Sequence, residues 1–330
     1  MSQFARQIKN LSIIESLSSD AAPSWWNDLL SLWRPSGIKS GDYGLRLAIR
    51  NGYVNFYRLG QSIARVEINH KGTPTATTHF KYVSAKGDLP PDSEYVKLRG
   101  EKILWRRGGE NEERCYGGIE DLKRWIASVN GELLVVGKPG YAGKEKRFVD
   151  QLVTENPDII DLEMGLPAWG ERTTASRMDI VALEDGKIVF WEAKLAGDAR
   201  LRCSTDVVKD KKPEVLKQLA DYREFLAEPG HAQLIAQAYQ RAAKELLLLR
   251  GVAERLGNPH RLGAGIVAAA LPSAQLEVAD IPRLVVLGLN KGAKQPSQEA
   301  WAHHVGRLKS QNIVMKVIEH DGPFLLGPVA

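Results

Sequence analysis

Cysteine is scarce in this chain, and long apolar runs are missing. Cys115 and Cys203 are the only two cysteines among 330 residues, too few for a disulfide framework or a four-thiolate zinc site. No stretch approaches the roughly 18 apolar residues of a membrane span, and the first residues have no apolar core of a secretory signal. These absences favour a cytoplasmic protein that does not depend on disulfides.

A large excess of one charge sign is missing too. Lys and Arg number 45 against 40 Asp and Glu, which gives a formal net charge of +5 and a pI near 9.0. Such a surplus permits a polyanionic partner without requiring one. Hydrophobic residues make up 43% of the chain, an ordinary value for a globular protein.

A glycine-rich stretch at residues 137–143, GKPGYAG, separates two parts of different texture. We expect an α+β domain over residues 1–138, whose role stays open with substrate binding as one option, and a second domain over residues 139–330. In the first part, the apolar spacing predicts helices over 3–17, 24–33 and 117–129.

Asn51-Gly52 predicts a tight hairpin turn between two strands of the first part. One face of this hairpin would be basic and aromatic, with Arg46, Arg50, Tyr53, Asn55 and Tyr57. Such a face suits single-stranded nucleic acid, or it is simply solvated. A following turn at Gly60-Gln61 would add Ala64, Val66 and Ile68 to the same face, which favours the solvated alternative.

The second part alternates helices with apolar strands, which predicts an α/β sandwich around a mixed sheet. We expect helices over 143–155, 213–227, 231–256 and 298–309. We expect strands over 159–164, 177–183, 188–195, 284–289 and 313–318.

The most informative stretch is residues 177–195, RMDIVALEDGKIVFWEAKL. Asp185-Gly186 predicts a two-residue hairpin loop, and this loop places Asp179 directly opposite Glu192. Lys194 then lies two residues further along the same face. A three-residue loop would instead separate the two acids. Both faces of the hairpin are otherwise apolar, as expected for strands covered on both sides.

Two carboxylates facing each other on neighbouring strands repel. A shared proton, a flanking Lys or Arg, or a hard divalent cation would each offset that repulsion. The alternative is that both acids sit at exposed strand ends, paired with Arg177 and Lys194.

Two helices add polar groups to apolar stripes. Glu145 shares a stripe with Phe148 and Leu152 in the helix from residue 143. In the helix from Pro213, Gln218 and Tyr222 are four residues apart and therefore neighbours. Each could be a satisfied polar group at the edge of a core.

Glu145, Asp179, the Glu192-Ala193-Lys194 triplet and Gln218-x-x-x-Tyr222 occur in an order that resembles the PD-(D/E)xK nuclease superfamily, and more narrowly its RecB-type branch. The resemblance covers residues 142–320, with Met178 in place of the proline that names the motif. It implies a restriction-endonuclease-like mixed-sheet sandwich, here preceded by a smaller α+β domain.

The resemblance also implies a Mg²⁺-dependent nuclease that hydrolyses phosphodiester bonds of DNA, with Mn²⁺ as a substitute and RNA not excluded as a substrate. Asp179, Glu192, the carbonyl of Ala193 and Glu145 would hold the metal. Lys194 would act beside them in catalysis, and Gln218 and Tyr222 would position the substrate. Nearby cations that suit phosphate contacts are Lys144, Lys146, Arg147, Arg200, Arg202, Lys209, Lys211 and Lys212.

The rival interpretation is a nucleic-acid-binding protein on a nuclease-like fold that no longer cuts. An unrelated α/β enzyme has no Gly-x-Gly-x-x-Gly, Walker or Gly-x-Ser-x-Gly motif to support it. His303-His304 is a poor chelate because adjacent helical residues point about 100° apart, so we expect surface histidines there.

Overall fold

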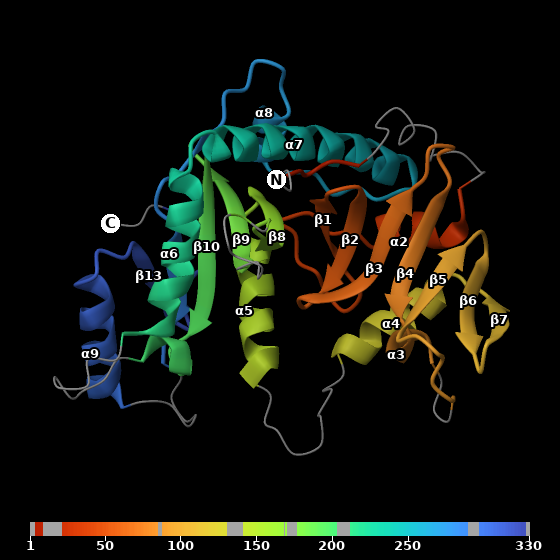
Figure 1. The fold of residues 1–330 in the computed structure, drawn as a ribbon, viewed down its shortest axis with the longest axis horizontal. Coiled ribbons are helices and arrows are strands. Elements are labelled where there is room, and N and C mark those ends of the chain that lie inside the picture. Colours follow the sequence, from red (N-terminus) through yellow and green to blue (C-terminus); the bar gives the residue numbers. More distant parts are fainter. Residues whose placement is uncertain are drawn as a thin grey trace.

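A computed structural model describes residues 4–8, 22–84, 88–130, 141–167, 169, 177–202, 212–289 and 297–327. Within these residues the protein is a mixed α/β structure with two sheets lying side by side (Figure 1). The predicted boundary at 138/139 lies outside the described residues, and the strands of each sheet lie wholly on one side of it. No helix of the described ranges is long and apolar enough to cross a membrane.

The N-terminal sheet has seven antiparallel strands that pair in chain order. Its strands are β1 (Arg46–Arg50), β2 (Tyr53–Arg58), β3 (Gln61–Ile68), β4 (Pro74–His79), β5 (Tyr95–Arg99), β6 (Lys102–Arg107) and β7 (Glu110–Cys115). The helices of this part are α2 (Ser24–Ser31), α3 (Phe80–Val83) and α4 (Ile119–Asn130). The predicted Asn51-Gly52 turn is confirmed, because Arg50 pairs with Tyr53.

The second sheet is mixed, with strand order β13-β12-β10-β9-β8 and β11 beside β10. Its strands are β8 (Ile159–Gly165), β9 (Arg177–Glu184), β10 (Lys187–Leu195), β11 (Glu277–Val278), β12 (Arg283–Leu287) and β13 (Met315–Ile318). The helices around it are α5 (Tyr141–Glu155), the 3-10 turn η1 (Ala199–Leu201), α6 (Glu214–Ala227), α7 (His231–Arg255), α8 (Ala264–Ala269) and α9 (Gln298–Lys309). The predicted helices and strands of this part are therefore present.

The hairpin of β9 and β10 is buried on both faces, as its apolar pattern predicts. Val181 and Phe190 belong to a core that also contains Tyr222 of α6, whereas Ile180 and Trp191 pack with Phe148 of α5. Helices α5 and α6 therefore cover opposite faces of this hairpin.

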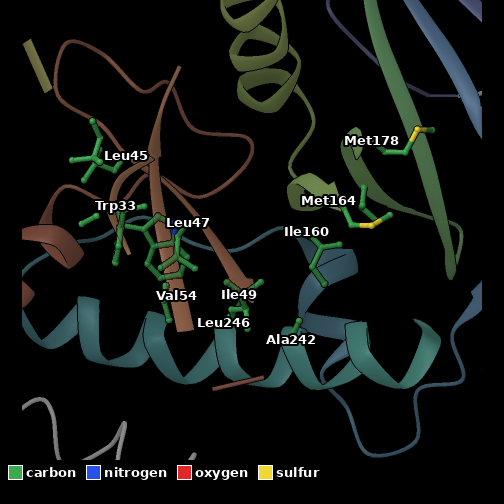
Figure 2. Packing of buried hydrophobic residues seen from close by; sticks show 14 of the residues in the cluster. Trp33, Leu45, Leu47, Ile49, Val54, Ile160, Met164, Met178, Ala242 and Leu246 are labelled. Atoms are coloured by element: carbon green, nitrogen blue, oxygen red, sulfur yellow. The ribbon is translucent and has the colours of Figure 1, made fainter. Parts of the chain in front are cut away.

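Helix α7 joins the two halves of the molecule (Figure 1). Its Ala242 and Leu246 lie in one continuous apolar core that runs from Leu47 on β1 to Ile160 on β8 (Figure 2). The two sheets therefore share this hydrophobic core.

The basic face of β1 and β2 is neither solvated nor free for nucleic acid, so both sequence alternatives are wrong. Arg46 donates to Asp150 of α5 over 2.9 Å. Arg50 and Arg6 both pair with Asp161 of β8, the Arg6 bond being 2.9 Å. Only 2% of the Asp161 side chain is exposed. This face is the charged part of the contact between the two sheets.

The turn after β2 also differs from the expectation. Arg58 pairs with Gln61, so the turn is Leu59-Gly60, and the register shifts after Phe56. This irregularity returns Ala64 and Val66 to the apolar face, opposite Phe56 and Val54. Ala64 and Val66 therefore do not join the basic face.

The predicted helix over 3–17 is wrong for residues 4–8, and residues 9–17 lie outside the described ranges. Gln7 forms a parallel bridge with Asn51, and the Ile8 amide donates to Glu245 of α7 over 2.7 Å. Phe4 and Ile8 are buried by these tertiary contacts. Packing against other elements has overridden a local helical pattern.

We predict that Glu245 makes the stability of the protein fall as pH rises. Its side chain is buried, and burial raises its pKa to about 8, opposed mainly by the Ile8 amide. The folded state therefore binds a proton that the unfolded state has lost, and this contribution is full below about pH 4 and is lost as pH rises through 8. In urea unfolding between pH 6 and 9, Glu245→Gln should show a flatter pH dependence, with a difference on the order of a few kcal/mol. Parallel curves for the two proteins would contradict this.

Candidate functional site

The turn between β9 and β10 sets the register of the site. Asp185 and Gly186 both have positive φ, 49° and 79°, as a type I′ turn requires. The ladder pairs Lys187 with Glu184 and continues to Trp191 opposite Ile180. The ladder ends at this pair; continuing the same register by one residue places Asp179 opposite Glu192, as the two-residue loop predicts.

Three charged groups meet where this ladder ends. Lys194 forms an ion pair with Glu192, and its Nζ lies 3.7 Å from Oδ2 of Asp179. Oδ2 of Asp179 also accepts the Ala193 N–H over 3.0 Å. All three side chains are buried, with residue exposures of 8% for Asp179, 2% for Glu192 and 1% for Lys194. The alternative of exposed strand ends is therefore wrong.

Burial and neighbouring charges shift the pKa values of Glu192 and Lys194. Burial raises the pKa of Glu192 to about 8, and Asp179 adds to the increase, while Lys194 opposes it. Burial would lower the pKa of Lys194, but Glu192 and Asp179 outweigh this effect and raise it. Oε2 of Glu192 is buried without a hydrogen-bond partner among the described residues. This oxygen therefore lacks the proton donor or cation that a buried carboxylate needs.

Glu145 lies beside this cluster and is held from another side. It accepts from Nη2 of Arg200 over 3.2 Å, and Arg200 is also bound to Asp198 at 2.6 Å. Burial raises the pKa of Glu145; Lys194 opposes this and Asp179 adds to it. Glu145 therefore experiences the charges of the site while its carboxylate is tied to Arg200.

Glu163 on β8 is a residue of the site that no sequence pattern indicates. It forms an ion pair with Lys146 of α5, whose Nζ is also 3.7 Å from Oδ1 of Asp179. Glu163 has φ of 51°, which L-residues rarely adopt. No local sequence pattern signals this backbone conformation, and the pairing depends on contacts between separate elements.

Gln218 and Tyr222 bind backbone carbonyls. Gln218 Nε2 donates to the Arg177 carbonyl over 2.7 Å, and the Tyr222 hydroxyl donates to the Met164 carbonyl over 2.9 Å. Tyr222 is fully buried, with its ring 6.0 Å from that of Phe190. These contacts attach α6 to β8 and β9, and substrate contact by either residue stays a prediction.

Cations surround the start of α5. Lys144 and Arg147 are exposed, whereas Lys146 is half-buried between them. Arg202 and Lys212 are also exposed, and Lys209 and Lys211 lie outside the described residues. The histidine expectation is wrong in part: His303 is exposed, but His304 is buried at 6% exposure by the packing of α9.

The donor set fits a hard divalent cation in its chemistry. Carboxylate oxygens of Asp179 and Glu192 and the carbonyl of Ala193 are the ligand types that Mg²⁺ prefers. Oε2 of Glu192, which has no hydrogen-bond partner among the residues that the structure describes, is an oxygen that such a cation could bind. Within the described ranges, however, no three His, Cys, Asp or Glu side chains converge as a ready-made metal site. Two carboxylates would therefore be the core of the ligand set, with Glu145 at its edge.

No family model, curated protein or solved structure matches this chain.

We predict that Mg²⁺ stabilises the protein through Asp179 and Glu192. A ligand present at about 100 times its dissociation constant adds about 2.7 kcal/mol to the free energy of unfolding. Thermal unfolding with and without Mg²⁺ should show a higher midpoint for the wild type and a smaller shift for Asp179→Asn. An equal Mg²⁺ shift in both proteins would exclude Asp179 as a ligand.

Proposed function

We propose that this protein is a Mg²⁺-dependent nuclease that hydrolyses phosphodiester bonds of DNA on a restriction-endonuclease-like sandwich. The observation that carries the proposal is the buried group of Asp179, Glu192 and Lys194 on two adjacent strands. Buried charges are costly unless they are paired, and one carboxylate oxygen of this group has no hydrogen-bond partner in the part of the chain that the structure describes. A site for a cation beside a lysine accounts for that arrangement.

The order of elements supports the proposed fold. Helix α5, strands β8, β9 and β10, helix α6 and strand β12 occur in this order in the chain, with η1 inserted before α6 and with α7, α8 and β11 inserted between α6 and β12. This is the helix–strand–strand–strand–helix–strand order that the PD-(D/E)xK resemblance implies. Strands β9 and β10 carry the acidic pair in its central hairpin.

The residues of the site would have separate roles in metal binding and in the attack of water. A bound Mg²⁺ supplies a Lewis acid that polarises the phosphorus and favours attack by water. Asp179, Glu192 and the Ala193 carbonyl would hold the ion, and Glu145 would support them directly or through water. The ammonium of Lys194 would orient the attacking water and counter the charge that develops on the phosphoryl oxygens.

Exposed cations near the site favour a polyanionic substrate. Lys144 and Arg147 flank Glu145 on the first turns of α5. Such side chains contact phosphates without reading sequence. We therefore infer DNA as the substrate, with RNA as the alternative polynucleotide to be tested alongside it.

We predict that Lys194→Ala and Asp179→Ala each lower the rate of Mg²⁺-dependent cleavage by about 100-fold or more while the fold survives, because both groups act on the developing charge. Linear, circular and single-stranded DNA, and a matched RNA, should be incubated with each protein with and without Mg²⁺. Circular dichroism checks the fold.

Lys187→Ala is the matched control, since Lys187 is an exposed lysine at the other end of β10, paired with Glu277. It should cleave at the wild-type rate. Wild-type rates in both site variants would remove the catalytic assignment. Binding of DNA without any Mg²⁺-dependent cleavage by the wild type would favour the rival, a binding protein that does not cut.

A further inference from the structure

Lys146 is placed between two acids that lie on neighbouring strands. In the register of β8 and β9, Leu162 pairs with Ile180 and Met164 with Met178, so Glu163 lies beside Asp179. The Lys146 ammonium pairs with Glu163 and lies 3.7 Å from Oδ1 of Asp179. Helix α5 therefore brings a second ammonium to the site, on the opposite oxygen of Asp179 from Lys194.

The two oxygens of Asp179 are not equivalent. Oδ2 accepts the Ala193 N–H and faces Lys194, whereas Oδ1 has Lys146 nearby at a distance too long for a hydrogen bond. Oδ1 is therefore the oxygen more open to an incoming cation. Lys146 therefore lies on the side of Asp179 whose oxygen accepts no hydrogen bond within the described residues.

The Lys146 ammonium has N–H donors that form no hydrogen bond within the described residues. An ammonium offers three N–H donors, and the one hydrogen bond of Lys146 within the described residues goes to Glu163. Three-quarters of its side chain is shielded from solvent. A partly desolvated cation with free donors is suited to bind a phosphate oxygen.

The N-terminal sheet packs against the stem of Lys146. Gly60, in the turn between β2 and β3, packs so closely that an added Cβ would lie 2.5 Å from Cδ of Lys146. Gly60 also has φ of +69°. Glycine is therefore favoured there both by the backbone conformation and by the lack of space for a Cβ. The turn limits where the stem of Lys146 can lie, although it belongs to the other sheet.

We propose that Lys146 is a phosphate-contacting residue of this site and that the Gly60 turn of the N-terminal sheet positions it. The substrate class is a polynucleotide phosphodiester, so the inference rests on the proposed function and adds to it a role for the N-terminal sheet. Glu163 orients Lys146 through their ion pair. The positive φ of Glu163 is a strained backbone conformation that accompanies this ion pair.

The test measures DNA binding separately from cleavage. The affinity of a labelled oligonucleotide is measured by fluorescence anisotropy from about 50 to 200 mM salt, with Ca²⁺ replacing Mg²⁺ because both take oxygen ligands. Lys146→Met should weaken binding by about 5- to 20-fold and lower the salt slope by about 1, as the loss of one phosphate contact predicts. Lys146→Arg should restore both quantities in part. Cleavage in Mg²⁺ should show a raised KM with a smaller change in kcat.

Gly60→Ala should shift affinity in the same direction as Lys146→Met. Gly100→Ala is its control, because Gly100 also has positive φ, +53°, in a turn of the same sheet, but an added Cβ there has nothing within 4 Å. Lys146→Met/Glu163→Gln removes both charges of the pair and checks that an unpaired Glu163 is not the cause. This double variant should keep the weakened binding.

Each outcome separates the two claims. Wild-type affinity and salt slope in Lys146→Met would overturn the phosphate contact, even if the wild type cleaves DNA. Equal behaviour of Gly60→Ala and Gly100→Ala would overturn the role of the turn. If Lys146→Met loses affinity and the wild type does not cleave DNA with Mg²⁺, the phosphate contact is supported and the nuclease proposal is overturned. A wild type that binds no polynucleotide would overturn both.

Discussion

The burial of two acids, Asp179 and Glu192, together with the ammonium of Lys194 is the physical constraint that dominates this protein. The two acids lie on adjacent strands of a covered sheet; Lys194 forms an ion pair with Glu192, and Lys146 and Lys194 each lie 3.7 Å from an oxygen of Asp179. A buried carboxylate oxygen without a partner is costly, and Glu192 has one. A chain selected for stability alone would gain from apolar residues at these positions. The charges therefore point to a use that needs them together.

Asp161 of β8 makes the second important set of contacts, which connect the two sheets. Arg6 and Arg50 both pair with this buried carboxylate, and Tyr239 of α7 donates to it over 3.0 Å. Burial would raise the pKa of Asp161, but the two guanidinium groups outweigh that and lower it. Because the sheets are held in this way, a turn of one can reach Lys146 beside the site in the other. The N-terminal sheet thus contributes to the geometry of the site through packing.

The sequence patterns predicted those features that depend on neighbouring residues alone, such as the turn between β9 and β10. The Asp185-Gly186 turn and the alternation around it determine both the register that brings Asp179 and Glu192 onto adjacent strands and the division of apolar residues between two cores. The burial of the basic face of β1 and β2 could not be predicted from local patterns, because the acid that pairs with Arg50 is 111 residues away in the chain. The shifted turn at Leu59-Gly60 depends on an irregular register. The positive φ of Glu163 likewise leaves no sign in the sequence.

The most direct test of the central claim is a crystal structure of the protein grown with Mn²⁺, with anomalous difference density used to locate the ion. We expect a peak within about 2.5 Å of one oxygen from each of Asp179 and Glu192, on the Oδ1 side of Asp179 and near Oε2 of Glu192, which has no hydrogen-bond partner among the described residues. Density confined to other places, or a pair of carboxylates that stays bound only to Lys194 at saturating Mn²⁺, would contradict it.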